Sequence, residues 1–181
     1  MTAFLYDKAA RVRLVLFDVD GVMTDGTVLL HPDGSESKHF HIRDGTAFVV
    51  AHREGLLTGL LSARQSATTA TRAAQLAVKI VHQGVADKLT TYERILAEHA
   101  LSDDEVAYMG DDLVDLPVLR RVGLSAAPSD AVPEVIGVVD FVAERRGGHG
   151  AVRDLVELVL RAKGRWSAVV SSYAPGQHHD R

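Results

Sequence analysis

Short apolar runs alternate with helix-length amphipathic stretches along the chain, and this alternation constrains the fold more than any other feature. A repeat of strand and helix places the strands in a mostly parallel sheet with helices on its faces. The 181 residues, of which 46% are apolar, suit a single compact unit. We therefore expect an α/β fold. The runs expected to form strands are Val12–Phe17, Leu56–Leu61, Val78–Val81, Val106–Met109 and Leu124–Ala126.

Acidic residues and glycines suggest where the helices begin and end. Asp44 is expected to cap a helix that ends at Glu54 before Gly55, and Asp87 to cap one that runs to about His99. Further helices are expected to end near Gly123 and to cover about Val152–Lys163, and Ser167–Arg181 is expected to be a loose tail. The chain thus divides into one domain over 1–164 and a tail over 165–181.

One segment interrupts the alternation. Thr27–Leu30 and Glu36–Ile42 are short extended runs separated by His31-Pro32-Asp33-Gly34, a sequence with strong turn preference. We expect a projecting β-hairpin over about 25–43. An isolated hairpin is marginal in water, so it should dock on another subunit, although it could instead fold back on its own domain.

Composition excludes several classes of function. The chain has no cysteine, which rules out disulfides and cysteine-bound zinc and favours a reducing, cytoplasmic location. A net charge of −4 and the lack of a basic stripe argue against a nucleic-acid partner. No export signal is evident, and no apolar run approaches the ~20 residues that span a bilayer, so no membrane partner is expected.

Two acidic clusters follow expected strands. Asp18 and Asp20 come directly after the most apolar run, and Asp111, Asp112 and Asp115 follow a later one. Carboxylates this close to buried strands repel one another unless a hard cation such as Mg²⁺ relieves the repulsion. Taken alone, the first cluster could be a turn and the second a helix start stabilised by acidic residues.

Two further polar sites lie between the acidic clusters. Ser62, with Arg64 close behind it, follows the second expected strand, and Lys88 begins a helix. Each could be an ordinary cap or a solvated charge. Ligands of open parallel sheets bind beyond the carboxyl ends of the strands, so all four sites are expected to meet in one crevice.

The order of these sites resembles that of the haloacid dehalogenase-like phosphatases, over roughly Val12 to Asp154. The resemblance implies a Rossmann-like core and a Mg²⁺ cofactor. It also implies catalytic residues Asp18, Asp20, Ser62 and Lys88 and metal ligands Asp18, Asp20, Asp111 and Asp112.

The resemblance further implies a role for each catalytic side chain. Asp18 would be the nucleophile that becomes an aspartyl-phosphate, and Asp20 the general acid and then the general base. Asp20 would also give the metal its backbone carbonyl. Ser62 would hydrogen-bond a phosphoryl oxygen, and Lys88 would balance the negative charge. Asp115 would orient Lys88 or the helix start.

A narrower resemblance is carried by Asp25-Gly26 through Phe40–Gly45, by Gln83-Gly84, by Gly110–Val118 and by Arg146–Arg153. This resemblance is to the 3-deoxy-D-manno-octulosonate 8-phosphate (KDO 8-phosphate) phosphatases. It implies a sugar-acid phosphate as substrate, a hairpin in place of a cap domain, and a homotetramer whose hairpins form a central barrel. Ser62-Ala63 departs from the Thr-Gly more common in that family.

Without a cap, other groups must recognise the substrate. On family resemblance, Arg43, Arg64 and Arg146 are placed to meet its carboxylate or phosphate, with Gly21 as a further substrate-binding residue. Each arginine could instead form a surface salt bridge. His39 and His41 have a spacing compatible with metal binding, but an exposed or interface role is the favoured interpretation.

Other functions are also compatible with the sequence. The same chemistry could act on a nine-carbon sugar-acid phosphate or on another small phosphometabolite. A signalling receiver phosphorylated on Asp would use a similar set of residues but would not need Asp20 so close to its phosphorylated residue. A catalytically idle oligomerisation module would not need the polar clusters to be intact.

Overall fold

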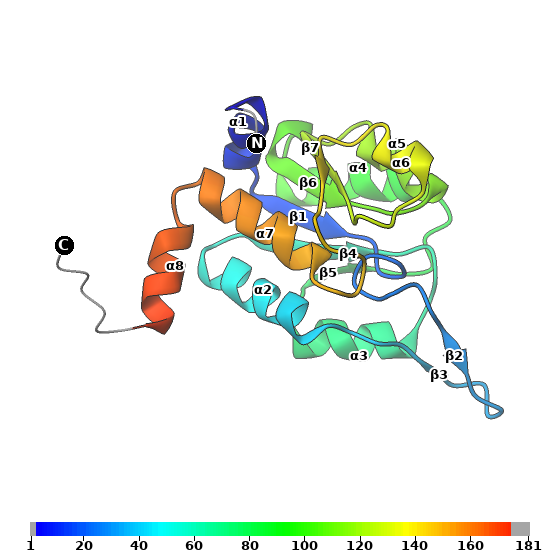
Figure 1. Cartoon of the computed structure of the whole chain (residues 1–181). Helices are drawn as coiled ribbons and strands as arrows, with labels where there is room; N and C mark the ends of the chain where they lie inside the picture. The colour runs from blue at the N-terminus through cyan, green and yellow to red at the C-terminus, as the bar shows by residue number, and fades with distance from the viewer. Residues whose placement is uncertain (1–2, 175–181) are drawn as a thin grey trace.

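The computed structural model describes residues 3–174, which form a sheet of six parallel strands in the order β5-β4-β1-β6-β7-β8 (Figure 1). Phe17 of β1 lies opposite Leu60 of β4 on one side and opposite Met109 of β6 on the other. The α/β class is therefore confirmed, with the first strand in the middle of the sheet. The strands are β1 (Leu14–Phe17), β4 (Leu57–Leu61), β5 (Ile80–His82), β6 (Val106–Met109), β7 (Leu124–Ala127) and β8 (Phe141–Val142).

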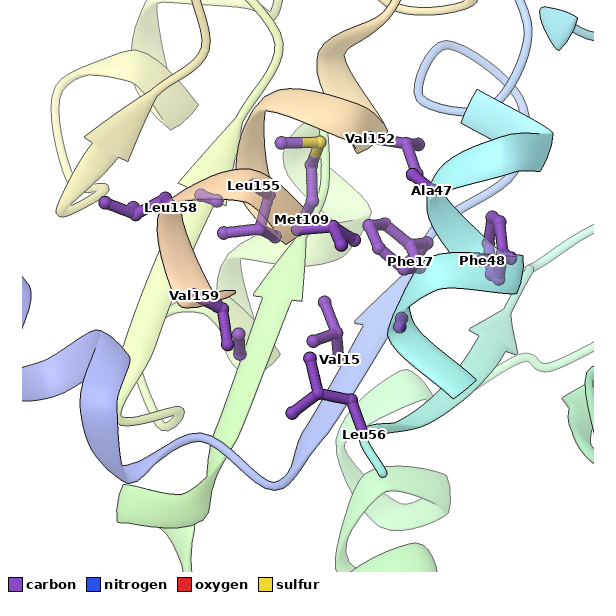
Figure 2. Packing of buried hydrophobic residues seen from close by; sticks show 14 of the residues in the cluster. Val15, Phe17, Ala47, Phe48, Leu56, Met109, Val152, Leu155, Leu158 and Val159 are labelled. Carbon is purple, nitrogen blue, oxygen red and sulfur yellow. The ribbon is translucent and has the colours of Figure 1, made fainter. Parts of the chain in front are cut away.

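Helices cover both faces of the sheet, because successive side chains of a central strand point to opposite faces. Val15 and Phe17 belong to the core beneath α1 (Ala3–Arg11), α2 (Ile42–Arg53) and α7 (Ala151–Ala162) (Figure 2). Leu14 and Leu16 belong to the core on the other face. The remaining helices are α3 (Ala67–Gln75), α4 (Lys88–His99), α5 (Leu116–Leu119), α6 (Pro133–Ile136) and α8 (Trp166–Tyr173), with 3₁₀ turns η1 (Asp103–Glu105) and η2 (Leu113–Asp115).

The expected capping role of Asp44 is wrong for its own helix. Helix α2 begins at Ile42, which places Asp44 in the first turn with its side chain buried. The carboxylate instead accepts hydrogen bonds from the backbone N–H groups of Gly150 and Arg153, at 3.1 and 2.9 Å. Asp44 therefore caps α7, because the start of that helix packs beside the start of α2.

The cap at Asp87 is confirmed. Its carboxylate accepts from the backbone N–H groups of Leu89 and Thr90, at 3.0 and 3.1 Å, and α4 ends at His99 as expected. This cap fixes the first turn of the helix, where Lys88 lies.

The hairpin is present and shorter than expected. Strands β2 (Leu29–Leu30) and β3 (Glu36–Ser37) pair in a separate antiparallel sheet that projects from the body of the molecule (Figure 1). The side chains of Leu29 and Leu30 are exposed. After β3 the chain leaves regular structure and returns to the domain.

The expectation of a loose tail is wrong for Ser167–Tyr173, which belong to α8. The half-buried ring of Trp166 packs against the core and lies between the guanidinium groups of Arg153 and Arg161, at 5.7 and 5.3 Å. These contacts hold the helix on the domain. Residues 175–181 of the expected tail lie outside the described residues, and the division at residue 164 stays a prediction. Over residues 3–174, the structure contains no helix with the length and apolar character needed to cross a membrane.

Candidate active site

The strand order brings the predicted sites to one edge of the sheet. Asp18 follows β1, Ser62 follows β4, and Asp111 lies just beyond β6, so the three come from neighbouring strands. The Asp18 N–H donates to the carbonyl of Met109 at 2.9 Å, which continues the pairing of β1 with β6 past the last strand residue. The expected meeting of these residues at the carboxyl edge of the sheet is therefore confirmed.

Lys88 joins the two acidic clusters. Its buried ammonium lies 2.8 Å from Oδ1 of Asp18, 2.6 Å from Oδ1 of Asp115 and 3.2 Å from the hydroxyl of Tyr108. Burial alone would lower the pKa of Lys88, but the two carboxylates outweigh it and raise the pKa above its ordinary value. Lys88 therefore stays charged beside Asp18.

Asp115 fixes the positions of Lys88 and of the backbone at Asp111 and Asp112. Its Oδ1 accepts from Lys88 and from the Tyr108 hydroxyl, and its Oδ2 accepts from the backbone N–H groups of Asp111 and Asp112 at 3.0 and 3.2 Å. Asp115 is fully buried, and its contacts agree with the expected role of orienting Lys88. Sequence reasoning missed Tyr108, because an aromatic residue within an apolar strand is usually an ordinary core residue.

The carboxylates fit a divalent cation. Oxygens of Asp18, Asp111 and Asp115 lie within 4.8 Å of one another, and the buried Oδ1 of Asp111 has no hydrogen-bond partner. Burial, followed by repulsion from Asp18 and Asp115, raises the pKa of Asp111 to about 8. Burial, partly offset by Lys88, raises the pKa of Asp18 to about 6. Since Asp115 already accepts hydrogen bonds on both oxygens, Asp18 and Asp111 are the carboxylates that can bind Mg²⁺.

Asp112, also expected to hold the metal, is not part of this cluster. Its side chain is exposed, and Oδ1 accepts from the backbone N–H of Leu113 at 2.7 Å, so that it caps η2. The carboxylate is thus used at the start of the 3₁₀ turn, because the chain turns away from the strand at this residue.

Gly21 allows the two acidic clusters to approach. Its φ is +90°, and a Cβ at this position would lie 2.1 Å from Oδ2 of Asp111. A side chain here would therefore collide with the predicted metal ligand as well as strain the backbone.

Asp20 lies between two cations. The ammonium of Lys38 is 2.6 Å from Oδ1, and Nε of Arg64 is 3.7 Å from Oδ2, as ion pairs without hydrogen-bond geometry. Glu36 of β3 pairs with Arg64 at 2.8 Å and accepts a hydrogen bond from the Ser66 hydroxyl. Sequence reasoning missed Lys38; the available signal was a basic residue just after the hairpin.

The other predicted site residues differ in their burial and in their contacts. Ser62 is buried, and its hydroxyl accepts from the backbone N–H of Arg64 at 3.2 Å. Arg43 is exposed in the first turn of α2. Nε of Arg146 pairs with Asp130 at 3.1 Å, and the Arg146 side chain is 71% exposed. This contact is a surface salt bridge, which was the alternative to substrate binding. Of the three predicted arginines, Arg64 is therefore the one that contacts Asp20.

The two histidines that follow the hairpin lie near other acidic residues. Nδ1 of His39 is 3.8 Å from Asp25, and Nδ1 of His41 is 3.8 Å from Asp44. His39 is largely exposed. Neither belongs to the carboxylate cluster that fits a metal.

The family model of haloacid dehalogenase-like hydrolases matches residues 35–154. That match covers most of the chain, and it includes the segments that carry Ser62, Lys88 and Asp111. The chain therefore belongs to the haloacid dehalogenase-like hydrolase family.

Particular relatives are more informative about the kind of hydrolase. The chain is 37% identical over 165 residues to the 3-deoxy-D-manno-octulosonate 8-phosphate phosphatase KdsC of Escherichia coli K12, covering 91% of this chain and 88% of the relative. The crystal structure of the corresponding phosphatase from Yersinia pestis matches with a TM-score of 0.91 and 35% identity, covering 92% of this chain and 90% of that one. The Moraxella catarrhalis phosphatase, solved with magnesium ion, phosphate ion and KDO, matches with a TM-score of 0.93 and 30% identity, covering 96% and 99%.

Proposed function

We propose that this protein is a Mg²⁺-dependent phosphatase that hydrolyses KDO 8-phosphate through an aspartyl-phosphate on Asp18. The observation that carries the proposal is the joint placement of Asp18, Lys88 and Asp111 at the carboxyl edge of the sheet. The similarity to KDO 8-phosphate phosphatases over nearly the whole chain supports the substrate.

Asp18 attacks the phosphorus, and the bond from phosphorus to the sugar oxygen breaks as the aspartyl-phosphate forms. Lys88 holds Asp18 in place and offsets the negative charge that builds up when an anionic nucleophile meets an anionic phosphate. Asp18, Asp111 and the backbone carbonyl of Asp20 would hold Mg²⁺, which when bound supplies further positive charge against the phosphoryl oxygens.

Asp20 moves the protons in both halves of the reaction. Its carboxyl gives a proton to the departing sugar alkoxide, and the resulting carboxylate then takes a proton from the water that attacks the aspartyl-phosphate. The Ser62 hydroxyl and the backbone near Gly21 hold the phosphoryl oxygens. Inorganic phosphate leaves, and Asp18 returns as a free carboxylate.

Substrate recognition falls to basic residues near the carboxyl edge of the sheet. Arg64 is proposed to meet the sugar acid, because its guanidinium already lies beside Asp20, the proposed acid for the leaving group. Arg43 and Arg146 are proposed as outer contacts. Compared with Thr-Gly, the Ser62-Ala63 pair adds a methyl group beside the phosphate, and this methyl group bears on which substrate fits. A nine-carbon sugar-acid phosphate is therefore the second candidate substrate.

The hairpin supports a proposed homotetramer. Leu29 and Leu30 expose apolar side chains at 60% and 73%, and burying them against other subunits would remove an unfavourable surface. Light scattering would give the subunit number. The cytoplasmic location stays a prediction, which fractionation of the source cells tests.

A panel of sugar phosphates assayed with Mg²⁺ tests the function. Turnover of KDO 8-phosphate with the largest kcat/KM supports the proposal, while a preference for the nine-carbon analogue supports the second candidate. If no panel member is hydrolysed, or if Asp18→Asn keeps full activity, the proposal is wrong. A phosphorylated protein that persists for minutes without releasing phosphate would instead indicate a signalling receiver.

A further inference from the structure

The side chain of Lys38 is completely buried although it carries a charge. The residue follows β3 on the chain that returns from the hairpin, and its ammonium lies 2.6 Å from Oδ1 of Asp20. It also donates to the Thr69 hydroxyl at 3.4 Å and lies 3.6 Å from Glu36. Burial of an ammonium is costly unless it is paired, so these contacts determine where the group can lie.

Asp20 depends on Lys38 more than on any other described group. Neither of its carboxylate oxygens has a hydrogen-bond partner, and the other nearby cation, Arg64, is 3.7 Å away and half exposed. Charge interactions between groups that exclude water are stronger than those at the surface. The buried ammonium is therefore the main constraint on the orientation of this carboxylate.

Lys38 is itself held from two sides. Glu36 lies close to Lys38 and also binds Arg64 and the Ser66 hydroxyl, while Thr69 reaches Lys38 from α3. The hairpin and α3 thus fix the ammonium before any substrate arrives. Such preorganisation is what a proton-transfer group requires.

We propose that Lys38 is a positioning residue for Asp20, so that the hairpin supplies part of the catalytic geometry of its own subunit. This inference rests on the proposed function. Lys38 contacts Oδ1, which leaves Oδ2 to carry the proton. That proton passes to the alkoxide oxygen as its bond to phosphorus breaks, and Oδ2 regains a proton from the attacking water. Lys38 keeps its own protons throughout.

The dependence of the rate on the leaving group tests this role. A sugar alkoxide needs protonation as it departs, whereas the phenolate of p-nitrophenyl phosphate leaves readily without it. Lys38→Met keeps most of the length of the side chain and removes the charge. It should lower kcat/KM for KDO 8-phosphate roughly 100-fold and that for p-nitrophenyl phosphate by less than about tenfold. Lys38→Arg should recover part of the loss.

Two controls separate positioning from a general structural effect. Lys79→Met makes the same substitution at an exposed residue beside β5 and should leave both substrates unaffected. In an Asp20→Asn background, Lys38→Met should no longer change the ratio of the rates at which the two substrates phosphorylate Asp18, because the carboxylate that it positions is gone.

Other outcomes would overturn the inference. Equal losses on both substrates would make Lys38 a structural residue, and a raised KM with unchanged kcat would make it a substrate ligand. If Lys38→Met does not fold, Lys38→Gln provides the same comparison. If the wild-type enzyme hydrolyses neither substrate, the proposed function itself fails, and this inference fails with it.

Discussion

Lys88 contacts Asp18 at 2.8 Å, although 70 residues separate them in the chain. The contact arises because α4 begins, at the cap of Asp87, beside the end of the central strand. The same ammonium binds Asp115, so one cation joins the segments after β1 and β6. Catalysis and stability therefore depend on the same buried charge.

Replacing Lys88 with Met should impair both properties. The change leaves Asp18 and Asp115 buried without their cation, and removing one partner of a buried ion pair typically costs about 3–5 kcal/mol. Turnover should fall to background. Chemical denaturation and steady-state kinetics on the same preparation check both expectations. Full stability in Lys88→Met would contradict the structural part.

Removal of the Asp111 carboxylate should stabilise the metal-free protein. The pKa of Asp111 is raised to about 8 in the folded state. Between its ordinary carboxyl pKa and this value, the folded state therefore binds more protons than the unfolded state. Stability of the metal-free wild type should therefore fall as pH rises from about 5 to 8. Asp111→Asn should reduce that fall.

The response to Mg²⁺ completes this test. Since protons and the cation compete for Asp111, added Mg²⁺ should raise the wild-type Tm more at the upper end of that pH range than at the lower end. Asp111→Asn should lose most of the Mg²⁺ response and its activity. Thermal unfolding with and without Mg²⁺ measures the response of each protein, and a phosphatase assay measures the activity. An equal Mg²⁺ response in the two proteins would remove Asp111 from the metal site.

Gly21→Ala should abolish activity, while Gly34→Ala should not. Both glycines have a positive φ, of +90° and +84°, so both substitutions carry a backbone penalty of about 1–2 kcal/mol. A Cβ at Gly21 would also meet Asp111, whereas a Cβ at Gly34 would meet nothing within 4 Å. Comparing the two variants separates the collision from the strain. Equal activity would show that the close approach to Asp111 is not required.

Asp44→Ala should destabilise the domain through α7. The substitution removes the carboxylate that accepts from Gly150 and Arg153, and loss of such a cap costs about 0.5–2 kcal/mol. Asp104→Ala is a matched control, because its ion pair with Arg11 is highly exposed and contributes little. Urea denaturation of both variants compares the losses. An equal effect would show that Asp44 does not stabilise the helix.

The sequence predicted those parts of the site that follow strands. Asp18, Ser62 and Asp111 end apolar runs, and parallel strands bring such ends to one edge whatever the details of packing. Lys88 could be placed because a cap precedes it. Each residue could be located from its own chain segment, but only the joint order of the segments distinguished a catalytic site from ordinary turns and caps.

Residues that depend on contacts between distant segments were missed or misplaced. Asp44 looked like the cap of its own helix, and only the packing of α2 against α7 reveals its real partner. The local signal for Lys38, a basic residue just after the hairpin, was too weak to single it out, because its burial depends on how the hairpin returns to the domain. Helix α8 was missed because its serines and β-branched valines have weak helix propensity, and the packing of Trp166 and the buried Val169 holds it in place.

The most direct test of the mechanism is a search for phosphate on Asp18. Asp20→Asn lacks the base that activates water, so with Mg²⁺ and p-nitrophenyl phosphate it should accumulate the covalent intermediate. After acid quenching, mass spectrometry of the digested protein should find phosphate on the peptide at Asp18. Continued phosphate release with that peptide unmodified, or phosphate on another residue, would contradict the mechanism.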